Sequence, residues 1–221
     1  MSPSAPVFLS ADWRWLAMLN YAIDPAVLAP HVPPGTELDF FEGQTYVSVV
    51  GFRFLNTRVK GIPIPFHRDF DEVNLRFYVR HEAEDGEWRR GVVFVKELVP
   101  KRAIAWVART VYGENYRAVP MRHSIVDPRS TKGEGSVAFE WKVGGRWHGL
   151  KAGIEGEPAM ADEGSEAQFI TEHYWGYAGG AGRRTVEYEV KHPSWRLWEA
   201  KQARLDLDTA LVYGSEFSEA L

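Results

Sequence analysis

The sequence predicts an α+β domain made mostly of antiparallel β structure, and three observations support this. Apolar and polar residues alternate with a period of two in several segments, most clearly over residues 73–80, as they do in half-buried strands. Turn-forming pairs such as Asp85-Gly86 and Gly144-Gly145 separate neighbouring segments of this kind. The 221 residues contain no linker, composition break or internal repeat, so we expect a single domain over residues 1–221.

About nine strands are expected along the chain. Alternation and a high content of β-branched and aromatic residues place them at 13–22, 45–55, 73–80, 88–98, 116–125, 135–143, 146–154, 186–190 and around 195–197. Gly51 falls inside the second of these strands and is expected to mark a bulge. So many strands fit poorly in one flat twisted sheet, which favours a closed or partly closed barrel or two layers of sheet.

Short helices are expected at 26–28, 101–112, 165–174 and in the tail from 206 onward. Asp24 and Pro25 have the residue types of an N-cap and of a first helical position. Apolar residues in the second of these segments recur at helical spacing, and Gly113 is well placed to end it. Ser165 is expected to open the third helix as its N-cap.

The composition excludes several classes of function. With no cysteine, the chain has no disulfide framework, thiolate nucleophile, Cys-ligated zinc or iron–sulfur cluster. A net charge of −4 provides no basic field, so we expect no nucleic-acid partner. We expect no membrane partner either, because no apolar run approaches the ~18–20 residues of a membrane span. The first residues lack the pattern of a secretory signal, which favours a cytoplasmic location.

Motifs for common cofactors are also missing. The sequence has no Walker loop, no dinucleotide-binding glycine motif and no nucleophile elbow. Its seven histidines include no His-x-His or His-x-x-x-His pair. We therefore expect neither a cofactor nor a metal. The glycine run at 179–182 is interpreted as a turn, because no helix clearly starts after it.

The informative signal is charge at positions where the period of two predicts burial. Arg14, Arg53, Lys96 and Glu97 each share a predicted strand face with apolar residues. Such groups either reach solvent with their charged ends or pair as structural salt bridges. The alternative is a polar chamber in which cations such as these hold an anionic ligand.

Residues 169–177 gather aromatic side chains around Glu172 and His173. One interpretation is the end of an amphipathic helix that caps the barrel. The other makes His173 a general base whose pKa is tuned by a neighbouring acid.

Several strings together resemble the YqjF-like family of uncharacterised conserved proteins, over nearly the whole chain. The strings are Leu16-Ala-Met-Leu-Asn-Tyr, Ala29-Pro-His-Val-Pro, Val50-Gly-Phe-Arg-Phe-Leu, Glu72-Val-Asn-Leu-Arg-Phe-Tyr-Val, Lys101-Arg-Ala-Ile-Ala-Trp-Val-Ala-Arg and Thr171-Glu-His-Tyr-Trp-Gly-Tyr. More remotely, the family is similar to acetoacetate decarboxylase. That resemblance implies a double-sheet β-barrel or cone around a central cavity.

The remote resemblance also implies site residues. Arg14, ten residues before Asp24-Pro25, matches an arginine of the decarboxylases, and Glu72 matches their strand-opening glutamate. Residues 108–117 align with their helix and the two lysines that follow it, which implies Arg109 as a further ligand contact. The two lysine positions fall on Tyr116 and Arg117.

The change at Tyr116 removes the expected covalent chemistry. Acetoacetate decarboxylase is the standard example of a lysine activated for Schiff-base formation, and neither a phenol nor a guanidinium forms an imine. The alternative source of an amine is Lys96, from another strand. An enzyme of this kind would be a lyase or hydrolase that acts on a small carboxylate without a Schiff base.

Three functions therefore stay open. In the first, Arg14 and Arg117 hold a carboxylate while Glu72 and Tyr116 handle protons. In the second, the same cavity binds a small molecule without turnover. In the third, side chains fill the cavity and the protein is structural. The resemblance and the aromatic content also favour a homo-oligomer.

Overall fold

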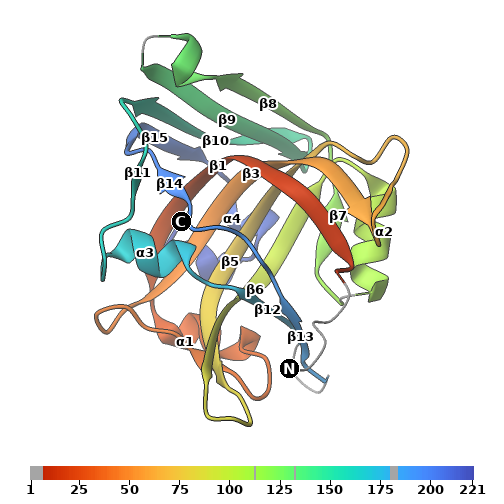
Figure 1. Ribbon diagram of the computed structural model, residues 1–221, viewed down its shortest axis with the longest axis vertical. Helices are drawn as coiled ribbons and strands as arrows, with labels where there is room; N and C mark the ends of the chain where they lie inside the picture. Colours follow the sequence, from red (N-terminus) through yellow and green to blue (C-terminus); the bar gives the residue numbers. More distant parts are fainter. Residues whose placement is uncertain (1–6, 112, 132, 180–183) are drawn as a thin grey trace.

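The computed structural model describes residues 7–221 except 112, 132 and 180–183, and in the helix that precedes residue 112 it describes only the backbone of 107–111. Within these residues the chain forms a nine-stranded sheet, a four-stranded sheet and a two-stranded ribbon (Figure 1). Most neighbouring strands are antiparallel, and the helices are short, as the sequence predicts. None of the described helices is long and apolar enough to cross a membrane.

The nine-stranded sheet has the order β1-β3-β5-β6-β12-β13, with β2 on β5, β4 on β3 and β7 on β6. Its strands are β1 (Leu9–Ile23), β2 (Glu37–Leu38), β3 (Thr45–Val59), β4 (Ile62–Pro63), β5 (Phe70–Glu82), β6 (Trp88–Val99), β7 (Tyr116–Ala118), β12 (Trp175–Ala178) and β13 (Val186–Glu189). The four-stranded sheet consists of β8 (Met121–Val126), β9 (Glu134–Val143), β10 (Arg146–Glu155) and β15 (Ala200–Asp206). The ribbon pairs β11 (Ala159–Met160) with β14 (Arg196–Leu197).

The helices lie at the turns between strands. They are α1 (Pro25–Leu28), α2 (Arg102–Val111), α3 (Glu166–Thr171) and α4 (Thr209–Val212), with 3-10 turns at Ala29–His31, Pro128–Ser130 and Ser215–Phe217. The predicted N-caps are confirmed, because Asp24 accepts a hydrogen bond from the Ala26 amide and Ser165 accepts one from the Gln168 amide. Gly113 follows α2 with φ +71°, as a helix-ending glycine does.

Strand β5 has two buried faces that lie in different parts of the protein. One face, called here the Leu75 face, carries Val73, Leu75 and Phe77, and all three are fully buried. They belong to one core with Phe139 and Leu150 of the four-stranded sheet. The other face, called here the Glu72 face, carries Glu72, Asn74, Arg76 and Tyr78, and these side chains are buried as well. The clean alternation over 73–80 therefore marks a strand buried on both sides.

Gly51 lies at the contact between the two sheets rather than at a bulge. A Cβ on Gly51 would come 2.7 Å from Cδ2 of Phe139. The register shift in this part of the sheet is instead on β1, between Arg14 and Ala17, and Trp15 there has φ +60°. The expected bulge at Gly51 is thus corrected to a close approach of two sheets.

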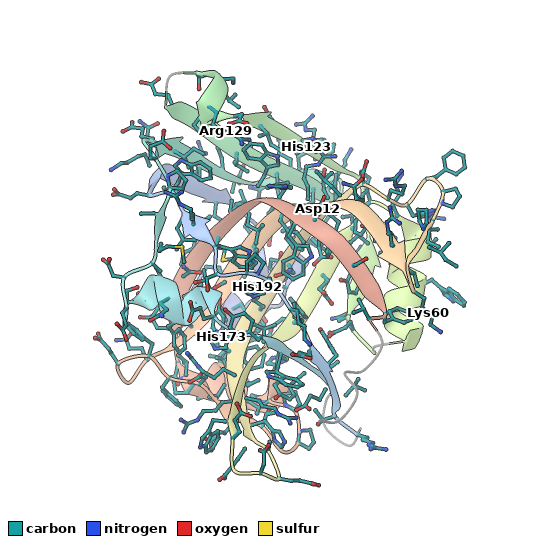
Figure 2. The ribbon with its side chains drawn as sticks, viewed as in Figure 1. Asp12, Lys60, His123, Arg129, His173 and His192 are labelled. Atoms are coloured by element: carbon teal, nitrogen blue, oxygen red, sulfur yellow. The ribbon has the colours of Figure 1, made fainter. Side chains whose placement is uncertain are left out.

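Aromatic rings cover the Glu72 face. The Trp13 ring lies 5.4 Å from that of Phe52 and 6.1 Å from that of Trp195. Trp195 in turn stacks on His192 at 4.1 Å. The segment after β13 thereby reaches back to β1 and encloses this face, and Figure 2 labels His192 in front of the large sheet. We call the Glu72 face together with this cover the chamber.

Several elements differ from the sequence prediction, among them β2, β4, β11 and β15, which lie outside the expected strands. The expected strand 116–125 is split at Pro120 into β7, which joins the large sheet, and β8, which joins the small one. Strand β12 was not expected, because the prediction placed no strand between the helix over 165–174 and the glycine run at 179–182. That helix ends at Thr171. Residues 180–183 of the glycine run lie outside the described residues.

Candidate functional site

Three glutamates are buried together at one end of the chamber. Glu72 on β5, Glu97 on β6 and Glu114 before β7 are only 2%, 2% and 6% exposed. Glu97 pairs with Asn74 of β5 across the antiparallel ladder and with Tyr116 of β7 across the parallel one. This register places Glu97 between β5, which carries Glu72, and β7, which Glu114 precedes. We call these three carboxyls the acid cluster.

Two tyrosines connect the acid cluster. The Tyr116 hydroxyl donates to Oε2 of Glu72 at 3.0 Å, and Asn74 Nδ2 donates to Oε1 of the same carboxyl at 3.1 Å. The Tyr188 hydroxyl donates to Oε1 of Glu114 at 2.7 Å. Gly176 makes room for the Tyr188 ring, since a Cβ there would come 2.2 Å from Cζ of that ring.

Burial changes the protonation of every member of the acid cluster. It raises the pKa of Glu72 to about 7, although the hydrogen bonds from Asn74 and Tyr116 lower it. Burial likewise raises the pKa of Glu114 to about 7, against the hydrogen bond from Tyr188. The pKa of Glu97 rises well above its usual range through burial and through the charges of Glu114 and Glu72, against a hydrogen bond from Tyr116. Glu72 and Glu114 therefore hold or release protons near neutral pH.

The buried arginine on this face is Arg76, which is 7% exposed. Its Nη2 makes a long contact of 3.4 Å to the Ile170 carbonyl and one of 3.8 Å to Sδ of Met18, and its Cζ lies 5.6 Å from the centre of the Tyr78 ring. Its Nε is buried and has no hydrogen-bond partner among the described residues. Such unpaired buried donors are uncommon in folded proteins, because desolvation without a partner is costly.

The Tyr78 ring contacts both Arg76 and His173. Its centre is 4.7 Å from that of the imidazole. Nε2 of His173 faces Oδ2 of Asp39 at 3.1 Å, and Arg90 donates to the same oxygen at 2.7 Å. Burial lowers the pKa of His173 to about 4 against the opposing effect of Asp39, so the ring is neutral at pH 7. Burial alone would raise the pKa of Asp39, but its hydrogen bonds from His173 and Arg90 lower it. Nδ1 of His173 is buried without a partner in the described part of the chain.

Most of the cations expected from the sequence lie on the wrong side of the sheet. Arg14, Arg53 and Asp71 are register partners, and Asp71 precedes Glu72 in the strand, so all three face away from it. Arg117 pairs with Leu98 and is exposed, as Arg14 is. The expectation that Arg14 and Arg117 surround Glu72 is therefore corrected.

Arg53 and Lys96 have structural partners on the Leu75 face. Arg53 Nε donates to Asp71 at 3.1 Å, and His123 of β8 contacts the other oxygen of Asp71 at 2.8 Å, which ties the two sheets together. Lys96 Nζ donates to the Val212 carbonyl at the end of α4. Burial and the charge of Arg117 lower the pKa of this lysine. The Arg109 side chain lies outside the described residues.

A bulge in β6 places Glu97 and Lys96 on the opposite sides from those that an unbroken alternation from Val93 would give. Leu75 pairs with Lys96, but the next residue, Arg76, pairs with Phe94, so Val95 is an extra residue. Past this bulge Glu97 faces the chamber and Lys96 faces the core.

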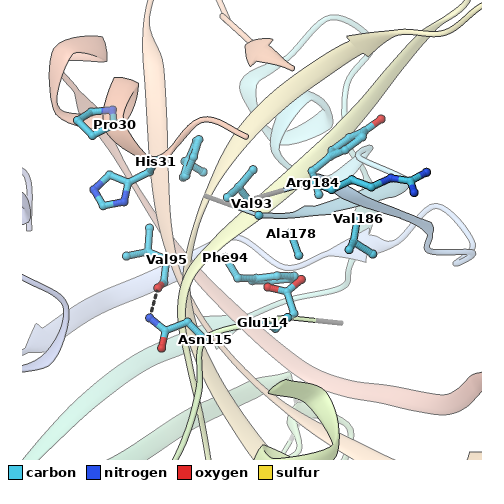
Figure 3. Close-up of a pocket in the computed structure, with 14 residues that line it drawn as sticks. Pro30, His31, Val93, Phe94, Val95, Glu114, Asn115, Ala178, Arg184 and Val186 are labelled. Atoms are coloured by element: carbon cyan, nitrogen blue, oxygen red, sulfur yellow. Dashed lines mark hydrogen bonds between the residues drawn. The ribbon is translucent and has the colours of Figure 1, made fainter. Parts of the chain in front are cut away.

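A pocket of about 440 Å³ lies beside the same bulge (Figure 3). Strand β12 pairs with β6 only at Gly91 and Val92, and β7 pairs with it from Glu97 onward. The pocket occupies the interval between them, where Phe94, Val95 and Ala178 line it together with Glu114 of the acid cluster. Its volume is that of a small-molecule site. Among the described residues, no group of three or more His, Cys, Asp or Glu side chains forms a candidate metal site.

Five residues of this arrangement were not expected as site residues: Asn74, Arg76, Glu97, Glu114 and Tyr188. Glu97 carried a signal, since its charge stands among valines. Asn74 and Arg76 look like the solvent side of an amphipathic strand. Nothing in the sequence around Glu114 or Tyr188 indicates that they meet.

The fold is that of acetoacetate decarboxylase-like proteins. An acetoacetate decarboxylase-like enzyme from Sphingomonas wittichii RW1 superposes with a TM-score of 0.60 at 16% identity, over 96% of this chain and 84% of that one. The enduracididine biosynthesis enzyme MppR, complexed with pyruvate, gives a TM-score of 0.65 at 14% identity, over 98% and 82%. Acetoacetate decarboxylase from Legionella pneumophila gives 0.58 at 14% identity, over 96% and 84%.

The sequence identifies the family. Residues 10–220 match the DUF2071 family, described as an uncharacterized conserved protein, and the chain belongs to it. It is also 27% identical over 214 residues to the uncharacterized protein YqjF of Bacillus subtilis (strain 168), which covers 94% of this chain and 81% of that protein. The YqjF-like resemblance seen in the sequence is confirmed.

Proposed function

We propose that the chamber binds a small organic acid, with Arg76 holding the carboxylate and Glu72 exchanging a proton with the ligand. The observation that carries this proposal is the Arg76 guanidinium, which is buried with its Nε unpaired. A buried guanidinium favours an anionic partner, and its planar donors match a carboxylate. The resemblance of the fold to MppR, whose structure contains pyruvate, supports a ligand of this class.

Glu72 suits proton transfer for two reasons. Its pKa of about 7 lets it hold or release a proton at neutral pH, which is the condition for efficient acid–base catalysis. Tyr116 and Asn74 hold both of its oxygens in place. Burial raises the pKa of Tyr116 well above its usual range, so its hydroxyl stays protonated and serves as a donor. The chemistry proposed is therefore noncovalent proton transfer on a bound acid, without an imine.

The pocket beside the β6 bulge serves as the way in. It reaches Glu114, which belongs to the acid cluster, and its other polar lining residues include His31, Asn115 and Arg184. Phe94 of its wall is the register partner of Arg76, so a ligand that enters there comes near both Glu114 and the strand position of Arg76.

Binding is tested with pyruvate, lactate, acetoacetate and propionate by titration calorimetry. We expect Arg76→Met to weaken binding at least about tenfold, since it removes a charge-assisted hydrogen bond. The matched control is Arg117→Met, an exposed arginine on the opposite face that the sequence had implied as a ligand. Loss of affinity in the Arg117 variant with none in the Arg76 variant would refute the proposal.

The proton-transfer role is tested with the acid that binds best. Exchange of its α-hydrogen with D2O is followed by NMR in the wild type and in Glu72→Gln. Exchange that depends on Glu72 supports an enzyme, whereas tight binding with no exchange in either protein would leave a binding protein in its place.

A further inference from the structure

The acid cluster has no positive partner in the described structure. None of the salt bridges there involves Glu72, Glu97 or Glu114. The charges that act on Glu97 are those of the other two carboxyls. A buried carboxylate without a cation is strongly disfavoured, so this cluster either keeps protons or takes up a positive group.

Two unpaired acceptors lie on neighbouring strands. Asn74 Oδ1 and Glu97 Oε2 are buried, and neither has a hydrogen-bond partner among the described residues. Each residue is only 2% exposed. They are direct cross-strand neighbours on the Glu72 face, and such side chains lie within about 5.5 Å at Cβ. One donor group between them would satisfy both acceptors.

We infer that the ligand of the chamber carries a protonated amino group, which Asn74 and Glu97 bind, so that the ligand is a small amino acid. This inference rests on the proposed function for the other end of the ligand, where Arg76 binds the carboxylate. An ammonium has three donors and no acceptor, whereas a hydroxyl has one donor. It also supplies the charge that the acid cluster lacks.

The strand geometry sets the separation of the two ends. Arg76 and Asn74 are two residues apart on one face of β5, so their Cα atoms are about 7 Å apart. The longer Arg76 side chain can bend toward Asn74 and shorten this span. A chain of one to three carbons between carboxylate and ammonium fits, which covers glycine, β-alanine and 4-aminobutyrate.

The first test compares ligands that share one skeleton and needs no variant. β-Alanine, 3-hydroxypropionate and propionate differ only in the group at carbon 3. We expect β-alanine to bind at least about tenfold more tightly than either of the others, because a charge-assisted hydrogen bond to a buried carboxylate is the stronger one. Equal or tighter binding of 3-hydroxypropionate or propionate would overturn the inference.

The second test uses Glu97→Gln, which keeps the shape and removes the charge. The advantage of β-alanine over propionate should fall to within about twofold in this variant, while propionate binds as before. The matched control is Glu189→Gln, an exposed glutamate that pairs with Lys191. An undiminished advantage in the Glu97 variant counts against the inference.

Propylammonium separates this inference from the proposed function, because it has no carboxylate. If propylammonium binds and Glu97→Gln weakens this binding while Arg76→Met does not, the ammonium site is supported. If propionate then fails to bind, the proposed carboxylate site at Arg76 is refuted. If propionate binds through Arg76 and the amino group adds nothing, only the inference falls. If none of these probes binds, both fall.

Discussion

Replacing Glu72 with glutamine tests the electrostatics of the acid cluster directly. The substitution keeps the size of the side chain and removes a buried carboxyl whose pKa is raised to about 7. Between pH 4.5 and about 7 the folded protein keeps a proton here that the unfolded chain has lost. Stability is therefore complete below pH 4.5 and falls as the pH rises through this window.

The size of this loss follows from the two pKa values. A rise from 4.5 to about 7 corresponds to about 3 kcal/mol, at about 1.4 kcal/mol for each pH unit. Glu72→Gln should remove that loss and also ease the repulsion that Glu72 exerts on Glu97 and Glu114. Relative to the wild type, the variant should gain about 3 kcal/mol of unfolding free energy between pH 4.5 and pH 8.

Urea unfolding followed by tryptophan fluorescence at pH 4.5, 6, 7 and 8 measures this difference on dialysed, ligand-free protein. Glu82→Gln is the control, because Glu82 is exposed at the other end of the same strand. Its difference from the wild type should stay constant across the pH range. If Glu72→Gln also shows a constant difference, the carboxyl does not titrate in this window and the reasoning fails.

Two further outcomes are expected. Gly176→Ala should displace the Tyr188 ring and destabilise the protein by about 1–3 kcal/mol in thermal unfolding. Gly149→Ala is the control and should destabilise the protein less, because the atom nearest to its new Cβ would be 3.4 Å away. Equal destabilisation by the two substitutions would contradict the tight contact at Gly176. Borohydride reduction with acetoacetate or pyruvate should leave the mass unchanged, since position 116 is a tyrosine and Lys96 donates to a backbone carbonyl on the other side of the sheet. A reduced adduct on any lysine would show that imine chemistry survives.

Local patterns in the sequence predicted the elements well. The alternation over 73–80 gave a strand, Asp24 and Ser165 cap the helices they were expected to cap, and the resemblance indicated the fold. The pairing of Glu72 with Tyr116 was also anticipated as a shared site. The sequence did not indicate that Arg76 rather than Arg14 shares this chamber, because alternation tells which residues share a face and not what covers that face.

The sequence by itself determined an antiparallel α+β fold, its family and the absence of a lysine at position 116. These follow from residue identity and from short-range periodicity, which need no knowledge of distant contacts. Only the tertiary structure decided which charges meet. One extra residue at Val95 turns Glu97 into the chamber and Lys96 out of it, and the segment around His192 and Trp195 buries a strand face that looks solvent-exposed. Bulges and long-range cover set the side of the sheet on which a charge lies, and they leave almost no local trace in the sequence.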